Sequence, residues 1–178
     1  MIFNNLTKRI RRFIVSHLGS DAKIKYLREQ GVKIGKDCRI DSLLFSTEPY
    51  LIEIGNKVSI ANGSALITHD ASITCFRDEY PNSDLFGTIK IGDNVFVGLN
   101  SMILPNTVIG NNCIIGAGSV VRGKFPDNSI IMGNPAKKIM DVKIHKMLCK
   151  NNPGRLETRN LSDAEKKPIV MEHFNKMR

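Results

Sequence analysis

The sequence predicts a repetitive β fold of short strands and tight turns, with helical segments at both ends. The main observation is an aliphatic residue at every sixth position from Ile91, in the series Ile91, Val97, Ile103, Ile109, Ile115 and Val121. Period six fits neither an α-helix nor a simple alternating strand, but it fits a strand and a turn repeated identically. In addition, aromatic residues make up only 6% of the 178 residues and tryptophan is absent, which favours an aliphatic β core.

Residues 1–31 are expected to form an N-terminal helical cap. Apolar residues recur there at helical spacing, at Leu6, Ile10, Phe13, Ile14 and Leu18, and basic residues between them exclude a membrane-spanning segment. One interpretation is that this helix packs on its own protein or on a partner subunit. The other is a peripheral contact of residues 1–19 with an anionic membrane surface. A second helical pattern over residues 21–30 ends at Gly31.

Residues 32–136 are expected to form the β domain, because the same register appears earlier at Ile34, Ile40, Ile54, Ile60 and Leu66. Asparagines are expected at the corners, where a positive φ or an Asx turn is tolerated, at Asn56, Asn62, Asn94, Asn100, Asn106 and Asn112. Cys38 and Cys113 fall on small inward positions and are interpreted as core residues. The four cysteines form no C-x-x-C pair, so we expect a reducing cytoplasm and no metal site.

The register breaks between Leu66 and Ile91, where residues 70–88 form a protruding loop too long for an ordinary connection. The loop combines carboxylates with aromatic residues, among them Asp70, Phe76 and Tyr80. Carboxylates accept hydrogen bonds from sugar hydroxyls and aromatic rings stack on sugar faces, although a solvated loop can carry the same residues. We interpret these three residues as candidate ligands of a sugar.

Residues 137–178 are expected to form a basic helical tail, with helical periodicity over 137–150 and a capped helix start at Leu161–Glu165. The net charge of +9 divides into +5 over residues 1–31, −2 over 32–136 and +6 over 137–178. A nucleic-acid-binding protein usually places its positive charge on the folded surface that reads the ligand, so no nucleic-acid partner is expected.

Three segments carry a family resemblance: I-G-D-N-V-F-V-G at 91–98, T-V-I-G-N-N-C-I-I-G-A-G-S-V-V at 107–121 and G-N-P-A-K at 133–137. They resemble the hexapeptide-repeat acyltransferases, over about 105 residues of this chain. The resemblance implies a left-handed parallel β-helix of triangular section. It also implies an acetyl-CoA-dependent O-acetyltransferase acting on a sugar hydroxyl, in the manner of the enzymes that decorate bacterial surface polysaccharides.

The same resemblance implies that His69, in the sequence Thr68-His69-Asp70, is the catalytic histidine. A hydroxyl attacks a thioester poorly unless its proton is removed as the bond forms, and a neutral imidazole suits that task. Either Asp70 or a backbone carbonyl could orient the imidazole, and both remain open. An acyl-enzyme on Cys75 is disfavoured, because no histidine neighbours it in the sequence.

Acetyl-CoA is the co-substrate that the resemblance implies, with no metal cofactor. In relatives, the pantetheine arm runs along the coils and contacts backbone one turn apart. The corresponding residues here are Leu99, which follows Gly98, and Ala117. Cations for the phosphates are then expected from Arg122, Lys137 and Lys138.

The resemblance further implies a cytoplasmic homotrimer whose active sites are shared between neighbouring chains. The acceptor could be a free, nucleotide-linked or lipid-linked sugar, or a drug.

The main alternatives are an N-acetyltransferase for an amino group on a nucleotide-linked sugar, and a streptogramin-type acetyltransferase. A zinc-dependent carbonic anhydrase needs three histidines from the repeats, and the repeats contain only His69. A non-catalytic scaffold would not explain the Thr-His-Asp and Gly-Asn-Pro-Ala-Lys segments.

Overall fold

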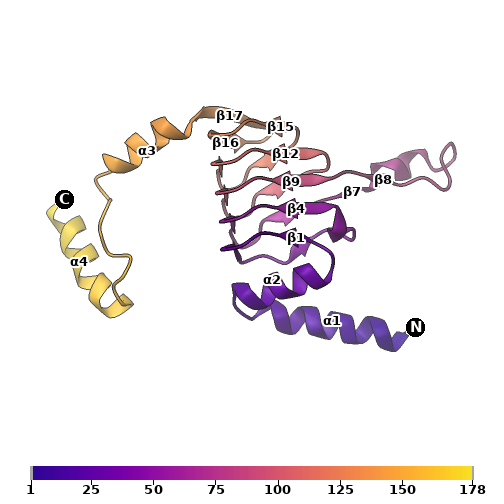
Figure 1. Ribbon diagram of the computed structural model, residues 1–178, viewed down its shortest axis with the longest axis horizontal. Coiled ribbons are helices and arrows are strands. Elements are labelled where there is room, and N and C mark those ends of the chain that lie inside the picture. The colour runs from indigo at the N-terminus through magenta and orange to yellow at the C-terminus, as the bar shows by residue number, and fades with distance from the viewer. Residues whose placement is uncertain (1, 178) are drawn as a thin grey trace. The chain divides into compact units, whose positions relative to one another are not determined.

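The computed structural model describes residues 2–177, with side chains from residue 6 onward. Residues 33–141 wind into a parallel β-helix, a spiral whose circuits we call coils (Figure 1). The first sheet contains β1 (Lys33–Ile34), β4 (Ile52–Ile54), β9 (Ile89–Ile91), β12 (Thr107–Ile109) and β15 (Lys124–Phe125). The repeated strands and turns predicted from period six, and the parallel β-helix that the family resemblance implies, are therefore confirmed.

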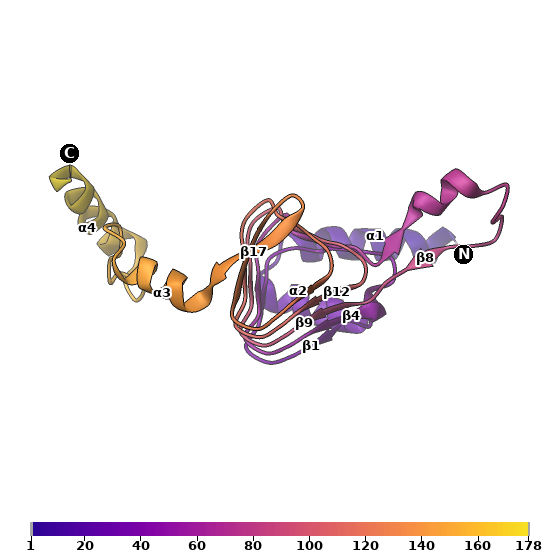
Figure 2. The ribbon, with the colours of Figure 1, turned by 90° about the horizontal axis from the view of Figure 1, so that it is seen from above.

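The second and third sheets complete each coil. The second contains β2 (Arg39–Ile40), β5 (Ser59–Ile60), β10 (Phe96–Val97), β13 (Ile114–Ile115), β16 (Ser129–Gly133) and β17 (Ala136–Asp141). The third contains β3 (Leu44–Phe45), β6 (Ala65–Leu66), β11 (Met102–Ile103) and β14 (Val120–Val121). In Figure 2 the coils overlie one another, and one excursion leaves them at a single corner.

The core is a set of aliphatic ladders that run along the β-helix. In the second sheet, the register places one inward side chain of each coil directly over the next: Ile40, Ile60, Val97, Ile115 and Ile131. Each of these side chains is at most 1% exposed. Burying aliphatic side chains in contact with one another is the main stabilising contribution in such a fold. The six-residue series identified in the sequence therefore forms the interior.

The corners follow the asparagine pattern only in part. Asn94, Asn100, Asn106 and Asn112 have φ between 54° and 62°, as expected for corner residues. Asn56 and Asn62 do not have a positive φ. Their following residues, Lys57 and Gly63, take that conformation with φ of 55° and 73°. At these two corners the positive φ therefore falls on the residue after the asparagine.

A column of glycines lets neighbouring coils approach closely at one corner. A Cβ on Gly55 would lie 2.7 Å from the carbonyl carbon and oxygen of Gly92 in the next coil. A Cβ on Gly92 would in turn lie 2.8 Å from the carbonyl carbon of Gly110. Real Cβ atoms do not approach backbone so closely, and the spacing between coils therefore depends on glycine at these positions.

Two helices cover the first coil, α1 (Ile2–Ser16) and α2 (Ser20–Glu29). Ile24 and Leu27 of α2 are 7% and 2% exposed and extend the core. The hydroxyl of Ser20 accepts a hydrogen bond of 2.7 Å from the backbone N–H of Ile40 in β2. α2 thus closes the end of the β-helix, and Gly31 follows it with φ of 99°.

The predicted helical periodicity over 137–150 is wrong for its first residues. Residues 136–141 form β17, which pairs antiparallel with β16 and covers the edge strand of the second sheet. Backbone pairing with an open edge outweighs a weak helical pattern here. The helix α3 (Val142–Lys150) begins only after this strand.

From Lys143 onward the chain forms a second compact unit. It contains most of α3 and the helix α4 (Asp163–Lys176). Ser162 and Glu165 form the capping box that the sequence predicts at the start of α4. Within residues 2–177, every helix is too short or too polar to cross a membrane.

Candidate active site

The excursion begins at His69, where the third sheet turns toward the first. β7 (His69–Asp70) pairs antiparallel with β8 (Leu85–Phe86), so the two ends of the excursion are held together. The backbone N–H of Gly87 also donates to the carbonyl of Thr68, at 2.8 Å. The His69 ring lies against Phe86 with ring centroids 4.9 Å apart, and its side chain is 31% exposed. His69 is therefore anchored on the rigid coils and still accessible.

Glu48 lies against the imidazole in the preceding coil. Its Oε1 is 3.5 Å from Nδ1 of His69, and its side chain is only 14% exposed. The hydroxyl of Thr68 donates to the Glu48 backbone carbonyl at 3.3 Å and approaches Oε2 at 3.5 Å. A largely buried carboxylate beside Nδ1 favours a proton on that nitrogen, which leaves Nε2 free to accept one.

A second carboxylate approaches the other ring nitrogen. Oδ1 of Asp84 lies 4.0 Å from Nε2 of His69 and 3.2 Å from Nη2 of Arg77. Arg77 also donates to the carbonyl of Ser83, so the returning arm of the excursion is tied to its tip. Each nitrogen of the His69 ring therefore has a carboxylate oxygen within 4.0 Å.

Asp70 does not orient the imidazole through any hydrogen bond given by the structure. Its Oδ1 accepts a hydrogen bond of 3.0 Å from the backbone N–H of Ser72 and caps the 3₁₀ helix η2 (Ala71–Phe76). The side chain and backbone of Ser72, with smaller effects of the charges of Arg122 and His69, hold the pKa of Asp70 below its ordinary value. The position beside Nδ1 belongs to Glu48, which sequence reasoning missed.

A signal for Glu48 was present in the sequence. It precedes His69 by 21 residues, close to the length of one coil, and it is followed by the short 3₁₀ helix η1 (Pro49–Leu51). Residues one coil apart stack on each other in a β-helix, so a carboxylate at this distance was the natural partner to seek.

Phe76 and Tyr80 lie on the outer part of the excursion and are 53% and 49% exposed. The backbone N–H of Tyr80 donates to the carbonyl of Phe76 at 2.8 Å, so a local turn brings the two residues close. Their role in binding a sugar, like that of Asp70, stays a prediction.

The residues expected to contact the coenzyme form a ladder at another corner. Leu99 follows β10 and Ala117 follows β13, and the N–H of Gly118 donates to the Leu99 carbonyl at 2.8 Å. A Cβ on Gly98 would lie 2.5 Å from the backbone nitrogen of Ala117, so the coils approach closely there. The third sheet separates this ladder from the His69 corner, by roughly 15 Å for about five extended residues.

The expected cations divide between two places. Arg122 follows β14, and its charge contributes to the lowered pKa of Asp70, so it belongs to the His69 corner. Lys137 and Lys138 are exposed on β17, opposite Met132 and Ile131 of β16. Their role in binding the phosphates of the coenzyme stays a prediction.

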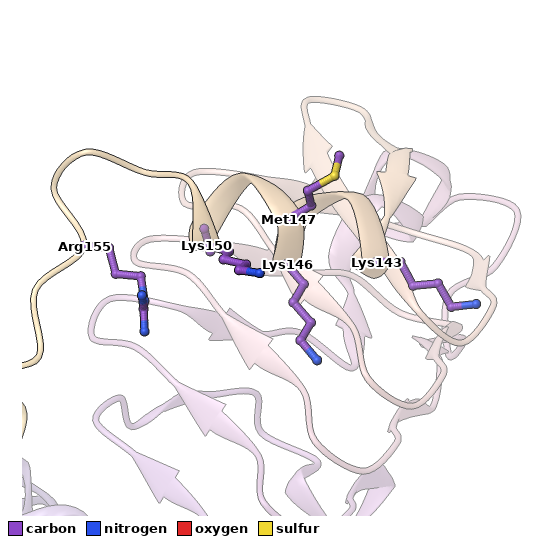
Figure 3. Close-up of a pocket in the computed structure, with 6 residues that line it drawn as sticks. Lys143, Lys146, Met147, Lys150 and Arg155 are labelled. Atoms are coloured by element: carbon purple, nitrogen blue, oxygen red, sulfur yellow. The ribbon is translucent and has the colours of Figure 1, made fainter.

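The second unit contains a hollow of about 800 Å³ along α3 (Figure 3). It is lined by Lys143, Lys146, Met147, Cys149, Lys150 and Arg155. It shares no residue with the His69 cluster, and Arg155 is paired with Glu157 at 3.1 Å.

Comparison with known proteins identifies one family. The family described as Bacterial transferase hexapeptide (six repeats) matches residues 88–123. Protein CapG of Staphylococcus aureus is 46% identical over 155 residues, which are 85% of this chain and 89% of CapG. The putative lipopolysaccharide biosynthesis O-acetyl transferase WbbJ of Escherichia coli is 51% identical over 51 residues, 29% of this chain and 26% of WbbJ.

Among solved structures, the hexapeptide-repeat acetyltransferase VCA0836 of Vibrio cholerae has the same fold, with a TM-score of 0.61 at 19% identity. The match covers 78% of this chain and 89% of the Vibrio chain. The structure of that protein complexed with acetyl coenzyme A matches with a TM-score of 0.56 at 22% identity, over 75% and 84% of the two chains.

Proposed function

The chain belongs to the hexapeptide-repeat acyltransferases, and we propose that it is an acetyl-CoA-dependent O-acetyltransferase that acetylates a sugar hydroxyl. The observation that carries this proposal is the accessible imidazole of His69, held between Glu48 and Asp84 at the neck of the excursion. A role in surface polysaccharide biosynthesis is supported by the similarity to WbbJ, whose description names lipopolysaccharide biosynthesis.

In this mechanism His69 is the general base. Acetyl-CoA supplies an acetyl thioester when bound. Nε2 of His69 takes the proton of the acceptor hydroxyl while the oxygen forms its bond to the acetyl carbon, and the carbon–sulfur bond then breaks. The proton passes from the imidazole to the departing sulfur. Such a positioned base contributes roughly 10²–10⁴-fold to the rate.

Glu48 is the positioning residue in this proposal. Its carboxylate, 3.5 Å from Nδ1, favours the tautomer with Nδ1 protonated and stabilises the positive charge that forms on the ring during proton transfer. The limited exposure of the Glu48 side chain strengthens this interaction, because little water surrounds the carboxylate.

The active site is completed by a second chain in the cytoplasmic homotrimer that we propose. Within one chain, the third sheet lies between His69 and the ladder of Leu99 and Ala117. The proposal places a pantetheine arm on that ladder beside His69 of the neighbouring chain. The sugar would then lie along the excursion, near Asp70, Phe76 and Tyr80.

The test is an acetyl-transfer assay with acetyl-CoA and a panel of free, nucleotide-linked and lipid-linked sugars, in which the released thiol is measured. His69→Ala is expected to lower turnover by about 10²-fold or more while leaving the fold intact. His145→Ala, outside the repeats, is the matched control and is expected to keep wild-type turnover.

Unchanged turnover in His69→Ala would exclude the proposed base. The product decides between the two acyl-transfer chemistries, because an ester is cleaved by mild alkali and an amide is not. An alkali-resistant product would replace the proposal with N-acetylation of an amino sugar.

A further inference from the structure

The helix α1 presents its apolar side to solvent. Phe13 is 69% exposed, and Leu6, Ile10 and Ile14 are each at least half exposed. At 3.6 residues per turn these four side chains lie within one arc of the helix. The apolar stripe itself is therefore not covered by the described part of this chain.

The opposite side of α1 holds the helix on the protein. Val15 is buried beside α2, at 8% exposure. The guanidinium of Arg11 pairs with Glu29 and lies 5.6 Å from the ring centroid of Tyr26. Nη2 of Arg12 donates to the Leu43 carbonyl at 2.9 Å. These contacts fix which side faces outward, and it is the apolar one.

The contrast with α2 shows that this arrangement is specific to α1. In α2, Ile24 and Leu27 face the β-helix and are buried. In α1, the side that faces the protein instead carries one valine and two arginines. The larger apolar side chains of α1 remain exposed. Exposing four such side chains to water costs free energy. We therefore expect this surface to bind another apolar surface or a membrane.

The charges of α1 indicate what kind of surface its apolar stripe binds. Residues 2–16 contain Lys8, Arg9, Arg11 and Arg12 and no acidic residue. Arg9 lies at the edge of the apolar stripe next to Phe13, so two copies of α1 placed face to face would bring like charges together, which disfavours a symmetric contact through the helix. An anionic phospholipid surface instead offers acyl chains to the apolar stripe and negative headgroups to Arg9 beside it.

We propose that α1 is an interfacial anchor that lies in the surface of an anionic phospholipid bilayer. Phe13, Ile10 and Leu6 enter the acyl-chain boundary, and Arg9 at the edge of the stripe remains at the headgroups. Arg11 and Arg12 serve instead to hold the helix to the protein. With 15 residues the helix extends only about 22 Å, so it lies along the surface. The binding goes beyond the proposed acetyl transfer and does not depend on it.

The experiment is co-sedimentation of the full-length protein with vesicles of equal parts phosphatidylglycerol and phosphatidylcholine, and with vesicles of phosphatidylcholine alone. Wild type is expected to bind the mixed vesicles, and raising the salt concentration is expected to weaken the binding. The double variant Ile10→Ser, Phe13→Ser is expected to bind about tenfold more weakly or worse. Arg9→Gln is expected to reduce the preference for phosphatidylglycerol.

The matched control is Ile169→Ser with Met171→Ser on α4, where the two apolar residues are 42% and 57% exposed. It is expected to bind vesicles like wild type. Circular dichroism checks that each variant is folded, and light scattering gives its oligomeric state. Failure of wild type to bind, or equal binding by the α1 variant, would overturn the proposal. A smaller oligomer in the α1 variant would also overturn it, because a second chain would then cover the stripe.

Discussion

The regular coils of the β-helix and the interrupted corner at His69 belong to the same backbone spiral, but they carry different kinds of side chain. Along the regular coils, Ile91, Val97, Ile103 and Ile109 point inward and are at most 4% exposed. At the interrupted corner, Glu48 and Asp84 approach the two nitrogens of one imidazole. The repeat therefore supplies rigidity, and the departure from the repeat supplies titratable groups that are partly open to solvent.

This difference separates stability from chemistry. A substitution in the regular coils should change the free energy of unfolding, because each coil packs against its neighbours. A substitution beside His69 should change the rate of acetyl transfer with little effect on unfolding. Each of the following experiments tests whether that separation holds.

The largest effect on stability is expected from Gly55→Ala. The new methyl group would meet the Gly92 carbonyl at 2.7 Å, and the coils would have to separate. Urea unfolding should show a loss of about 1–3 kcal/mol. Gly19→Ala is the matched control, because nothing lies within 4 Å of its added Cβ. Equal stability of the two variants would show that the coil spacing does not depend on these glycines.

Glu48→Gln should have a smaller effect than Gly55→Ala, and it should change the activity without changing the stability. It removes the charge beside Nδ1 of His69 and keeps the shape of the side chain. We expect kcat to fall about tenfold, with the KM for acetyl-CoA unchanged. Glu53→Gln is the control, because Glu53 pairs with Lys33 and Lys90 on the first sheet. A kcat as high as that of the control would remove Glu48 from the mechanism.

The smallest effect is expected from Ser72→Ala. The side chain of Ser72 is the largest cause of the lowered pKa of Asp70, so the variant should raise that pKa toward 3.8. NMR titration of the carboxylate measures the shift. Because the folded pKa is lowered, the contact favours the folded excursion above that range and is lost as the pH falls through the folded pKa. An unchanged titration would contradict the assignment of this contact.

Much of the fold follows from local pattern. Period six identifies the inward residues because every coil repeats one environment, and Gly31 ends a helix for a local steric reason. The predictions failed where a non-local contact decides the outcome. Residues 136–141, for example, form a strand because β16 offers an open edge.

The candidate site shows the same limit. The place of His69 at the break in the register is visible along the chain, and its catalytic role is what the family resemblance implies. Glu48 could not be identified from neighbouring residues, because stacking of successive coils brings it to the imidazole. The sequence also did not show which side of α1 faces outward. That side is decided by the contacts of Arg11 and Arg12 with residues far along the chain.

The most direct measurement mixes two inactive variants, His69→Ala and Ala117→Trp. His69→Ala keeps the ladder on which the pantetheine arm is expected to lie, and Ala117→Trp blocks that exposed ladder while keeping the histidine. If each site combines His69 of one chain with the ladder of the next, subunit exchange should restore activity to about a quarter of the sites. No recovery after exchange, confirmed by mass spectrometry of mixed trimers, would contradict a site shared between chains.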